Sequence, residues 1–164
     1  MSFVLVAGLL AACGSSPHPK STPSKRPTAG PPGAPGQKLT VGGTVGATMY
    51  EYRQPSVTGT SSPGPSGYTW GSADVEVCIL PQAKGTVTVD WVTWALRYAD
   101  NSVVEAATTV DNAFPQPLYP VKSHPVAAGQ CVRGWVTFAV PADKKPTLVE
   151  YTPHGFVAQW RTGT

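Results

Sequence analysis

Short runs of alternating apolar and polar residues, separated by Pro and Gly, constrain the fold of this chain more than any other feature. Residues 74–79 and 86–91 alternate one by one and are rich in β-branched side chains. This is the pattern of a strand with one buried face. Stretches 132–140, 148–151 and 156–160 repeat it. We therefore expect several short strands.

The turn signals between these runs favour a sandwich of two sheets. Pro or Gly stands at 81, 85, 115, 117, 120, 125, 129, 141, 146, 153 and 155, and short strands with such spacing are typical of an immunoglobulin-like β-sandwich. We assign this all-β domain to residues 39–164. Only residues 91–98 are ambiguous, because Trp91, Trp94 and Tyr98 also fit one face of a helix. The β-branched residues just before them favour a strand.

The N-terminal residues resemble a bacterial lipoprotein signal. Residues 10–14 read Leu-Ala-Ala-Cys-Gly after an apolar run over 3–12. That run is about half the roughly 20 residues that a spanning helix needs. We expect residues 1–12 to be a signal peptide and Cys13 to carry at least two acyl chains, enough for stable membrane anchoring. The predicted location is the cell membrane, on its extracytoplasmic face.

Residues 13–38 are predicted to form a disordered tether. The stretch 14–37 holds seven Pro, four Gly and four Ser and no aromatic residue, so it lacks the apolar surface that a core needs. In polyproline II it would reach about 75 Å. The tether also carries four of the 12 cations and none of the nine acids. The remaining domain is near −1 (8 − 9), which gives no basis for nucleic-acid binding.

Two cysteines remain once Cys13 is acylated. Outside the cytoplasm, Cys78 and Cys131 are expected to form a disulfide; free thiols or a metal site are the alternatives, although two Cys without a nearby His make a poor zinc site. Each Cys shares its strand face with polar neighbours, opposite the apolar positions. We therefore predict a cross-strand or strand-end disulfide at the periphery, rather than one buried between two sheets.

The C-terminal segment resembles a known family. Ala128-Gly129-Gln130 precedes a strand that reads Arg-Gly-Trp-Val-Thr-Phe-Ala-Val-Pro over residues 133–141, and a strand at 148–151 and Trp160 follow. This resembles the Gly-x-Val-x-Phe-x-Val-Pro block of the immunoglobulin-like, telokin-like domain of unknown function in actinobacterial secreted lipoproteins. It is similar to the immunoprotective extracellular antigen family of mycobacteria. The resemblance implies a β-sandwich in an envelope or secreted context, without known catalytic residues.

Exposed aromatic and Arg side chains are the candidate functional residues. We expect Trp70, Arg133 and Trp135 to form a binding surface, because Trp and Arg dominate protein interfaces; alternatively, the tryptophans pack across strands. His124 and His154 are expected in loops, and no catalytic or metal-binding motif occurs. The prediction is a non-catalytic binding domain without a cofactor, for an envelope or extracellular protein partner. A carrier of a small apolar ligand between the sheets is the alternative, and an envelope hydrolase a weaker one.

Overall fold

Strands dominate the described part of the chain. The computed structural model describes residues 29–57, 63–64 and 66–163. Its elements, in chain order, are β1 (Leu39–Val41), β2 (Val45–Arg53), β3 (Tyr68–Ile79), β4 (Thr86–Val89), η1 (Trp91–Thr93), β5 (Trp94–Arg97), β6 (Val103–Glu105), β7 (His124–Ala127), β8 (Cys131–Pro141), β9 (Leu148–Tyr151), η2 (Pro153–Gly155) and β10 (Ala158–Arg161). No helix among these residues is long and apolar enough to cross a membrane.

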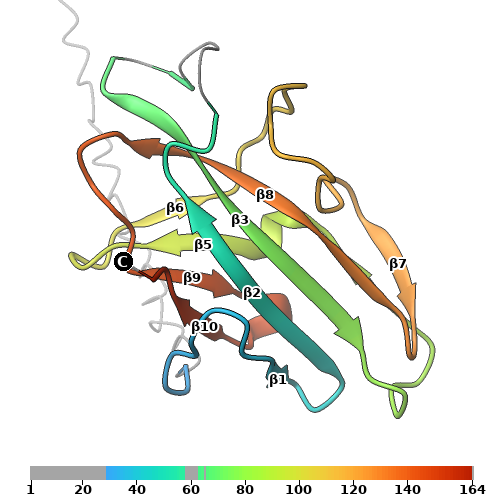
Figure 1. Ribbon diagram of the computed structural model, residues 1–164. Helices are drawn as coiled ribbons and strands as arrows, with labels where there is room; N and C mark the ends of the chain where they lie inside the picture. Colours follow the sequence, from blue (N-terminus) through green and yellow to red (C-terminus); the bar gives the residue numbers. More distant parts are fainter. Residues whose placement is uncertain (1–28, 58–62, 65, 164) are drawn as a thin grey trace, which may run out of the picture.

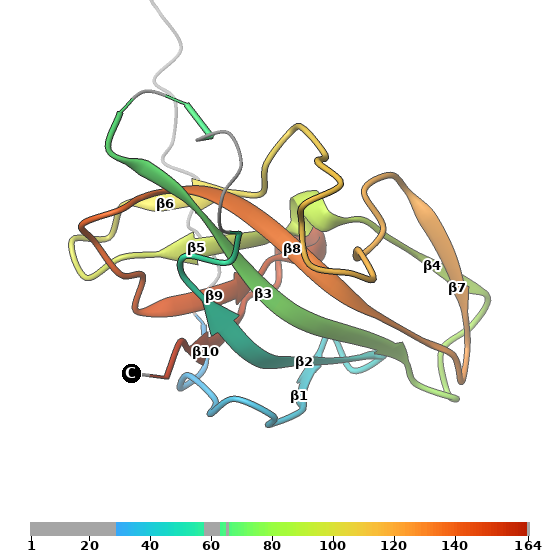
Figure 2. The ribbon, with the colours of Figure 1, turned by 45° about the horizontal axis from the view of Figure 1, so that its top comes forward.

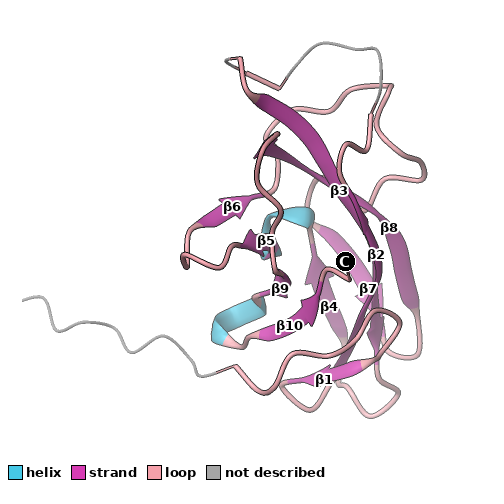
Figure 3. Cartoon of the chain, turned by 60° about the vertical axis from the view of Figure 1, so that its left-hand side comes forward, coloured by secondary structure: helices cyan, strands magenta, loops and turns pink. Residues whose placement is uncertain are grey.

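Two four-stranded sheets pack face to face and form the predicted β-sandwich. One sheet has the order β1-β2-β3-β8, and the other has the order β10-β9-β5-β6. Figure 3 shows the two layers nearly edge-on. The ribbon of β4 and β7 extends from one end of the sandwich (Figures 1 and 2). All the pairings within the sheets are antiparallel.

The core lies between the sheets and follows the alternation of the sequence. On β3 the odd-numbered residues from Ala73 to Ile79 are almost fully buried, and on β8 Val136, Phe138 and Val140 are 0% exposed. Because side chains alternate across a strand, the intervening residues form the outer face of this sheet. The second sheet contributes an aromatic stack in which the ring of Trp94 lies 4.6 Å from Tyr151 and 5.8 Å from Trp160.

The ambiguous segment at residues 91–98 contains both kinds of structure. Its first part is the 3₁₀ turn η1, and only Trp94–Arg97 form a strand. The hydroxyl of Thr93 donates to the carbonyl oxygen of Asp90 at 2.7 Å and so helps to close the turn. The turn lets both Trp91 and Trp94, three residues apart, enter the core. The strand expected for residues 91–98 therefore begins only at Trp94, three residues after the start of the segment.

The folded part of the chain begins before the predicted boundary at residue 39. The backbone of Gly33 pairs with β10, donating to the carbonyl oxygen of Gln159 at 2.8 Å and accepting from the N–H of Arg161 at 3.0 Å. The indole N–H of Trp160 donates to the carbonyl oxygen of Gln37 at 2.7 Å. The unpaired edge of β10 thus finds partners in the Pro- and Gly-rich segment. Residues 1–28, with the predicted signal peptide and most of the predicted tether, lie outside the described residues.

Candidate functional site

The predicted disulfide is present and lies at the periphery of the sandwich. Cys78 at the end of β3 and Cys131 at the start of β8 are direct partners in the register, and their sulfurs are bonded. Cys131 is exposed, and Cys78 faces outward with Glu76 rather than into the core. The cross-strand arrangement inferred from the alternation of side chains is therefore confirmed.

The outer face of β2, β3 and β8 carries a group of paired charges and aromatic rings. We call it the arginine–aromatic face and define it by Tyr50, Arg53, Asp74, Arg133 and Trp135. The three strands lie side by side at the front of the view in Figure 1. Two of the predicted binding residues, Arg133 and Trp135, belong to this face, because both have the outward parity of β8.

Arg133 is fixed from two sides although half of its side chain is exposed. Its guanidinium donates to both carboxylate oxygens of Asp74, at 3.1 and 2.6 Å, and lies 3.8 Å from the ring centre of Tyr50. The hydrogen bonds with Asp74 raise the pKa of Arg133. The Tyr50 hydroxyl donates to Oε1 of Glu76 at 3.3 Å; burial, and then the charge of Glu76, raise the pKa of Tyr50. Arg133 is thus a pre-oriented cation with 50% of its side chain exposed.

A second arginine lies over an aromatic ring beside the first. The guanidinium of Arg53 is 4.8 Å from the ring centre of Trp135, and it donates to both carboxylate oxygens of Glu51 at 2.9 and 2.6 Å. Both partners of this ion pair are about half exposed, so the pair itself adds less than about 1 kcal/mol to stability. It leaves a charged group ordered on the surface.

The expected exposure of Trp135 is wrong, because this residue is only 8% exposed. The segment that contains Pro117 and Tyr119 runs along the free edge of β8 (Figure 2). The N–H of Trp135 donates to the carbonyl oxygen of Pro117 at 2.9 Å, and the N–H of Tyr119 donates to the carbonyl oxygen of Trp135 at 3.0 Å. Trp135 therefore supports Arg53 rather than presenting an open ring.

Trp70 is the third predicted binding residue and lies near the start of β3, at the other end of the strand from Cys78. It is partly buried, and its ring packs edge-on against Phe114 with the ring centres 4.8 Å apart. Phe114 belongs to the same long connection that shields Trp135. The structure therefore brings Arg133 and Trp135 together in one face, while Trp70 packs against a loop.

A β-bulge explains why strict alternation along β2 does not place Arg53 on this face. Strict alternation puts Tyr50 and Tyr52 on the same face of β2, but the register shifts between Met49 and Glu51. An extra residue in one strand reverses the alternation beyond it. Tyr50 therefore faces outward with Glu51, whereas Tyr52 turns inward, where burial raises its pKa. The partners Arg53 and Asp74 also depend on this register.

The structure gives little support to the carrier and hydrolase alternatives. Large aromatic side chains fill the space between the sheets, and those almost fully buried are Trp91, Trp94, Tyr119, Phe138, Tyr151 and Trp160. A hollow of about 380 Å³ lies instead at one end, beside β4 and η2, and opens to solvent. His154 lines this hollow, and His124 lies in β7; both are exposed.

Comparisons with known proteins define the fold but not a family. No protein-family model and no curated protein match this chain. The secreted protein MPT63 from Mycobacterium tuberculosis is similar in structure, with a TM-score of 0.59 and 20% identity over 84% of this chain and 99% of that chain. The yjhA protein from Bacillus subtilis has a TM-score of 0.53 and 12% identity over 74% and 81% of the two chains. A functionally unknown protein from Listeria monocytogenes has the same TM-score and identity over 80% and 84%. These likenesses establish a shared β-sandwich fold, in agreement with the expected immunoglobulin-like architecture.

Proposed function

We propose that this chain is a membrane-anchored lipoprotein of the cell envelope whose β-sandwich binds a protein partner without catalysis. The anchor rests on the Leu-Ala-Ala-Cys-Gly signal at residues 10–14. Cys13 lies outside the described residues. The structural likeness to MPT63, which is described as secreted, is consistent with work outside the cytoplasm.

The observation that carries the binding function is the pre-oriented, half-exposed Arg133. Ordering a long side chain at an interface costs about 0.5–1.5 kcal/mol. Asp74 and Tyr50 have already fixed the guanidinium in the free protein, which reduces that cost. Arginine and aromatic residues are the side chains that contribute most to protein interfaces. Opposite charges alternate over the face, so we propose a partner with a complementary mixed-charge surface.

The anchor is tested by the intact mass of the protein purified from its native membrane. We expect a chain that begins at Cys13 and carries the mass of at least two acyl chains. A Cys13→Ser variant should lose the added mass and leave the membrane fraction. Recovery of the wild-type chain without added mass, in the soluble fraction, would remove the anchor from the proposal.

Binding is tested by crosslinking the full-length protein in intact cells, followed by capture and mass spectrometry of the complexes. Arg133→Ala should reduce capture of a specific partner at least about tenfold, which corresponds to 1.4 kcal/mol. The matched control is Lys84→Ala, which removes an exposed cation from the β3–β4 turn. If both variants captured the same proteins as the wild type, Arg133 would have no role in binding.

A further inference from the structure

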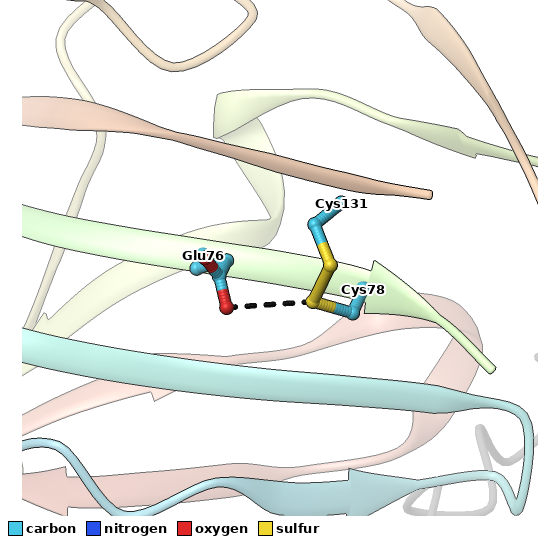
Figure 4. Close-up of side chains that lie close together, drawn as sticks. All are labelled: Glu76, Cys78 and Cys131. Carbon is cyan, nitrogen blue, oxygen red and sulfur yellow. Dashed lines mark hydrogen bonds between the residues drawn. A yellow bond between two sulfur atoms is a disulfide. The ribbon is translucent and has the colours of Figure 1, made fainter. Parts of the chain in front are cut away.

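The disulfide and a neighbouring carboxylate form a compact group on the outer face of the first sheet. Glu76 and Cys78 are two residues apart on β3, and Cys131 pairs directly with Cys78. Oε1 of Glu76 lies 3.4 Å from Sγ of Cys78. Because a disulfide sulfur has no proton to donate, this is a close approach. One ligand atom from each residue lies within 4.8 Å of the others, and Figure 4 shows all three side chains converging.

We propose that reduction of the Cys78–Cys131 bond converts this group into a binding site for a thiophilic divalent metal such as Zn²⁺. The ligands would be the two thiolates and the carboxylate of Glu76, with water as the fourth. Zn–S and Zn–O distances of about 2.3 and 2.0 Å in a tetrahedron separate sulfur from oxygen by about 3.5 Å. The observed separation between Glu76 Oε1 and Cys78 Sγ is 3.4 Å. The carboxylate of Glu76 is therefore already at the distance from Cys78 that a shared zinc ion requires, and a small movement of the sulfurs preserves that distance.

Only the two sulfurs have to move. Tetrahedral coordination places two zinc-bound sulfurs about 3.8 Å apart, and their Cα atoms are 3.9 Å apart in the register. Once the S–S bond is broken, rotation about the Cα–Cβ bonds provides the separation without a change in the strands. Cys131 is exposed, so a metal ion reaches the site from solvent and water can complete the coordination.

The neighbouring side chains suit a metal in this position. The hydroxyl of Tyr50 donates to Oε1 of Glu76 at 3.3 Å and so orients the carboxylate, as partners of ligands commonly do in metal sites. Two thiolates, one carboxylate and Zn²⁺ sum to −1. Nζ of Lys38 lies 3.9 Å from Sγ of Cys78, and its positive charge offsets the remaining negative charge. The metal ligands Glu76, Cys78 and Cys131 are distinct from Arg133, so metal binding and partner binding can each fail alone; Tyr50 contacts both Glu76 and Arg133.

The conversion requires a two-electron reductant, and a dithiol is the class that we propose. Its thiolate attacks the sulfur of Cys131, which is an exposed residue, the S–S bond breaks, and Cys78 leaves as a thiolate. The second thiol of the reductant then closes its own disulfide and releases Cys131. The reductant loses two electrons, and both cysteines become thiols after taking up protons. Metal binding releases these two protons again.

The test uses the full-length protein, with its own oxidised form as control. A phosphine opens the disulfide, taking oxygen from water to become a phosphine oxide, and is then removed under nitrogen. Titration with Co²⁺ should give one equivalent of bound ion, with thiolate charge-transfer absorption and the visible bands of tetrahedral cobalt. Zn²⁺ should displace the Co²⁺. The oxidised protein and a Cys78→Ser, Cys131→Ser variant should show neither signal.

Two substitutions separate the proposed site from unspecific thiol chemistry. Glu76→Gln should weaken Zn²⁺ binding by the reduced protein at least tenfold, and Tyr50→Phe should weaken it about 10- to 100-fold through the ligand that it orients. Glu51→Gln is the matched control, since it alters a carboxylate of the same sheet face that pairs with Arg53. Unchanged affinity in Glu76→Gln, or an oxidised protein that binds as well, would overturn the proposal.

A second measurement tests the proposed metal site even if reduction of the disulfide partly unfolds the protein. A metal that binds only the native state stabilises it. One equivalent of Zn²⁺ should then restore the near-ultraviolet circular dichroism of the reduced wild-type protein, and it should have no effect on the Cys78→Ser, Cys131→Ser variant. Failure of Zn²⁺ to restore the wild-type signal would also overturn the proposal.

Discussion

The close approach of a connecting segment to β8 makes Gly134 sensitive to the smallest substitution. A Cβ atom at this position would collide with the backbone nitrogen of Tyr119 and would lie 2.5 Å from the carbonyl carbon of Leu118, a distance that Cβ atoms in proteins essentially never show. Gly134→Ala should therefore push this segment away from the strand. Two hydrogen bonds between the segment and Trp135 would be lost, at about 0.5–1.5 kcal/mol each.

The displacement also affects the core, because Tyr119 is 0% exposed. Complete loss of a large buried aromatic side chain costs about 3–5 kcal/mol, and partial withdrawal costs a fraction of this. The partial withdrawal of Tyr119 and the loss of the two hydrogen bonds should together lower the free energy of unfolding of Gly134→Ala by about 3 kcal/mol and its Tm by about 10 °C. That is a large part of the 5–15 kcal/mol typical of a domain.

Urea denaturation followed by circular dichroism measures this loss as a lower midpoint at unchanged slope. The matched control is Gly30→Ala, because a Cβ at Gly30 meets nothing within 4 Å; it should stay within about 0.5 kcal/mol of the wild type. A Gly134→Ala variant within 1 kcal/mol of the wild type would show that the segment does not depend on this contact.

Three further measurements test the energetics of the sandwich. Arg97→Met should destabilise the protein by about 3–5 kcal/mol in urea, because it removes bonds of 2.6 and 3.0 Å to the fully buried carboxylate of Glu150; addition of Glu150→Gln should recover part of the loss, and a cost below 1 kcal/mol would contradict the ion-pair account. Burial raises the pKa of Tyr151 to about 12. The neutral Tyr151 therefore contributes to the free energy of unfolding at pH values below about 10, the pKa of tyrosine in the unfolded chain, and up to about 3 kcal/mol of this contribution is lost as the pH rises toward 12. In urea titrations at alkaline pH, the free energy of unfolding of a Tyr151→Phe variant should decline less with pH than that of the wild type, and identical declines would exclude this role. Replacing both Cys78 and Cys131 by Ser should lower the free energy of unfolding by about 4 kcal/mol, because the disulfide no longer closes a loop of 53 residues in the unfolded chain. Calorimetry of this variant without added metal measures the loss, and an unchanged Tm would refute it.

The alternation of the sequence was sufficient to predict β3 and β8 of the first sheet, but it did not delimit β1 and β2. It assigned the outward positions of β3 and β8 correctly, and with them the peripheral position of Cys78 and Cys131, because side-chain direction depends only on parity along an unbroken strand. The same rule fails on β2 beyond Tyr50, at Glu51, Tyr52 and Arg53, where a bulge reverses the parity. A bulge is fixed by the pairing of two strands, and neither strand shows it alone.

Burial of the outward residues was not predictable in the same way. Trp135 has the parity of an exposed residue, yet it is 8% exposed: Arg53 lies over its ring, and a segment that precedes β8 in the chain pairs with its backbone. Gly33 similarly joins β10 although it lies in a Pro- and Gly-rich stretch, more than 120 residues earlier in the chain. In both cases a strand edge with free hydrogen-bonding groups selects a distant partner. The partner that a strand edge selects cannot be predicted from the residues near that strand in the sequence.

The sequence by itself determined the sandwich class, several of the strands including β3 and β8, the pairing of the two cysteines and the presence of Arg133 on an outer face. These properties depend on residue type and on a period of two, both of which are local. The tertiary structure decided that Asp74 and Tyr50 hold Arg133, that Glu76 lies against the disulfide, and that Trp135 is covered. The contacts of Arg133 join residues more than 50 positions apart, and those of Trp135 and the disulfide need a second strand or the returning segment beside them, so they arise only when the sheets assemble.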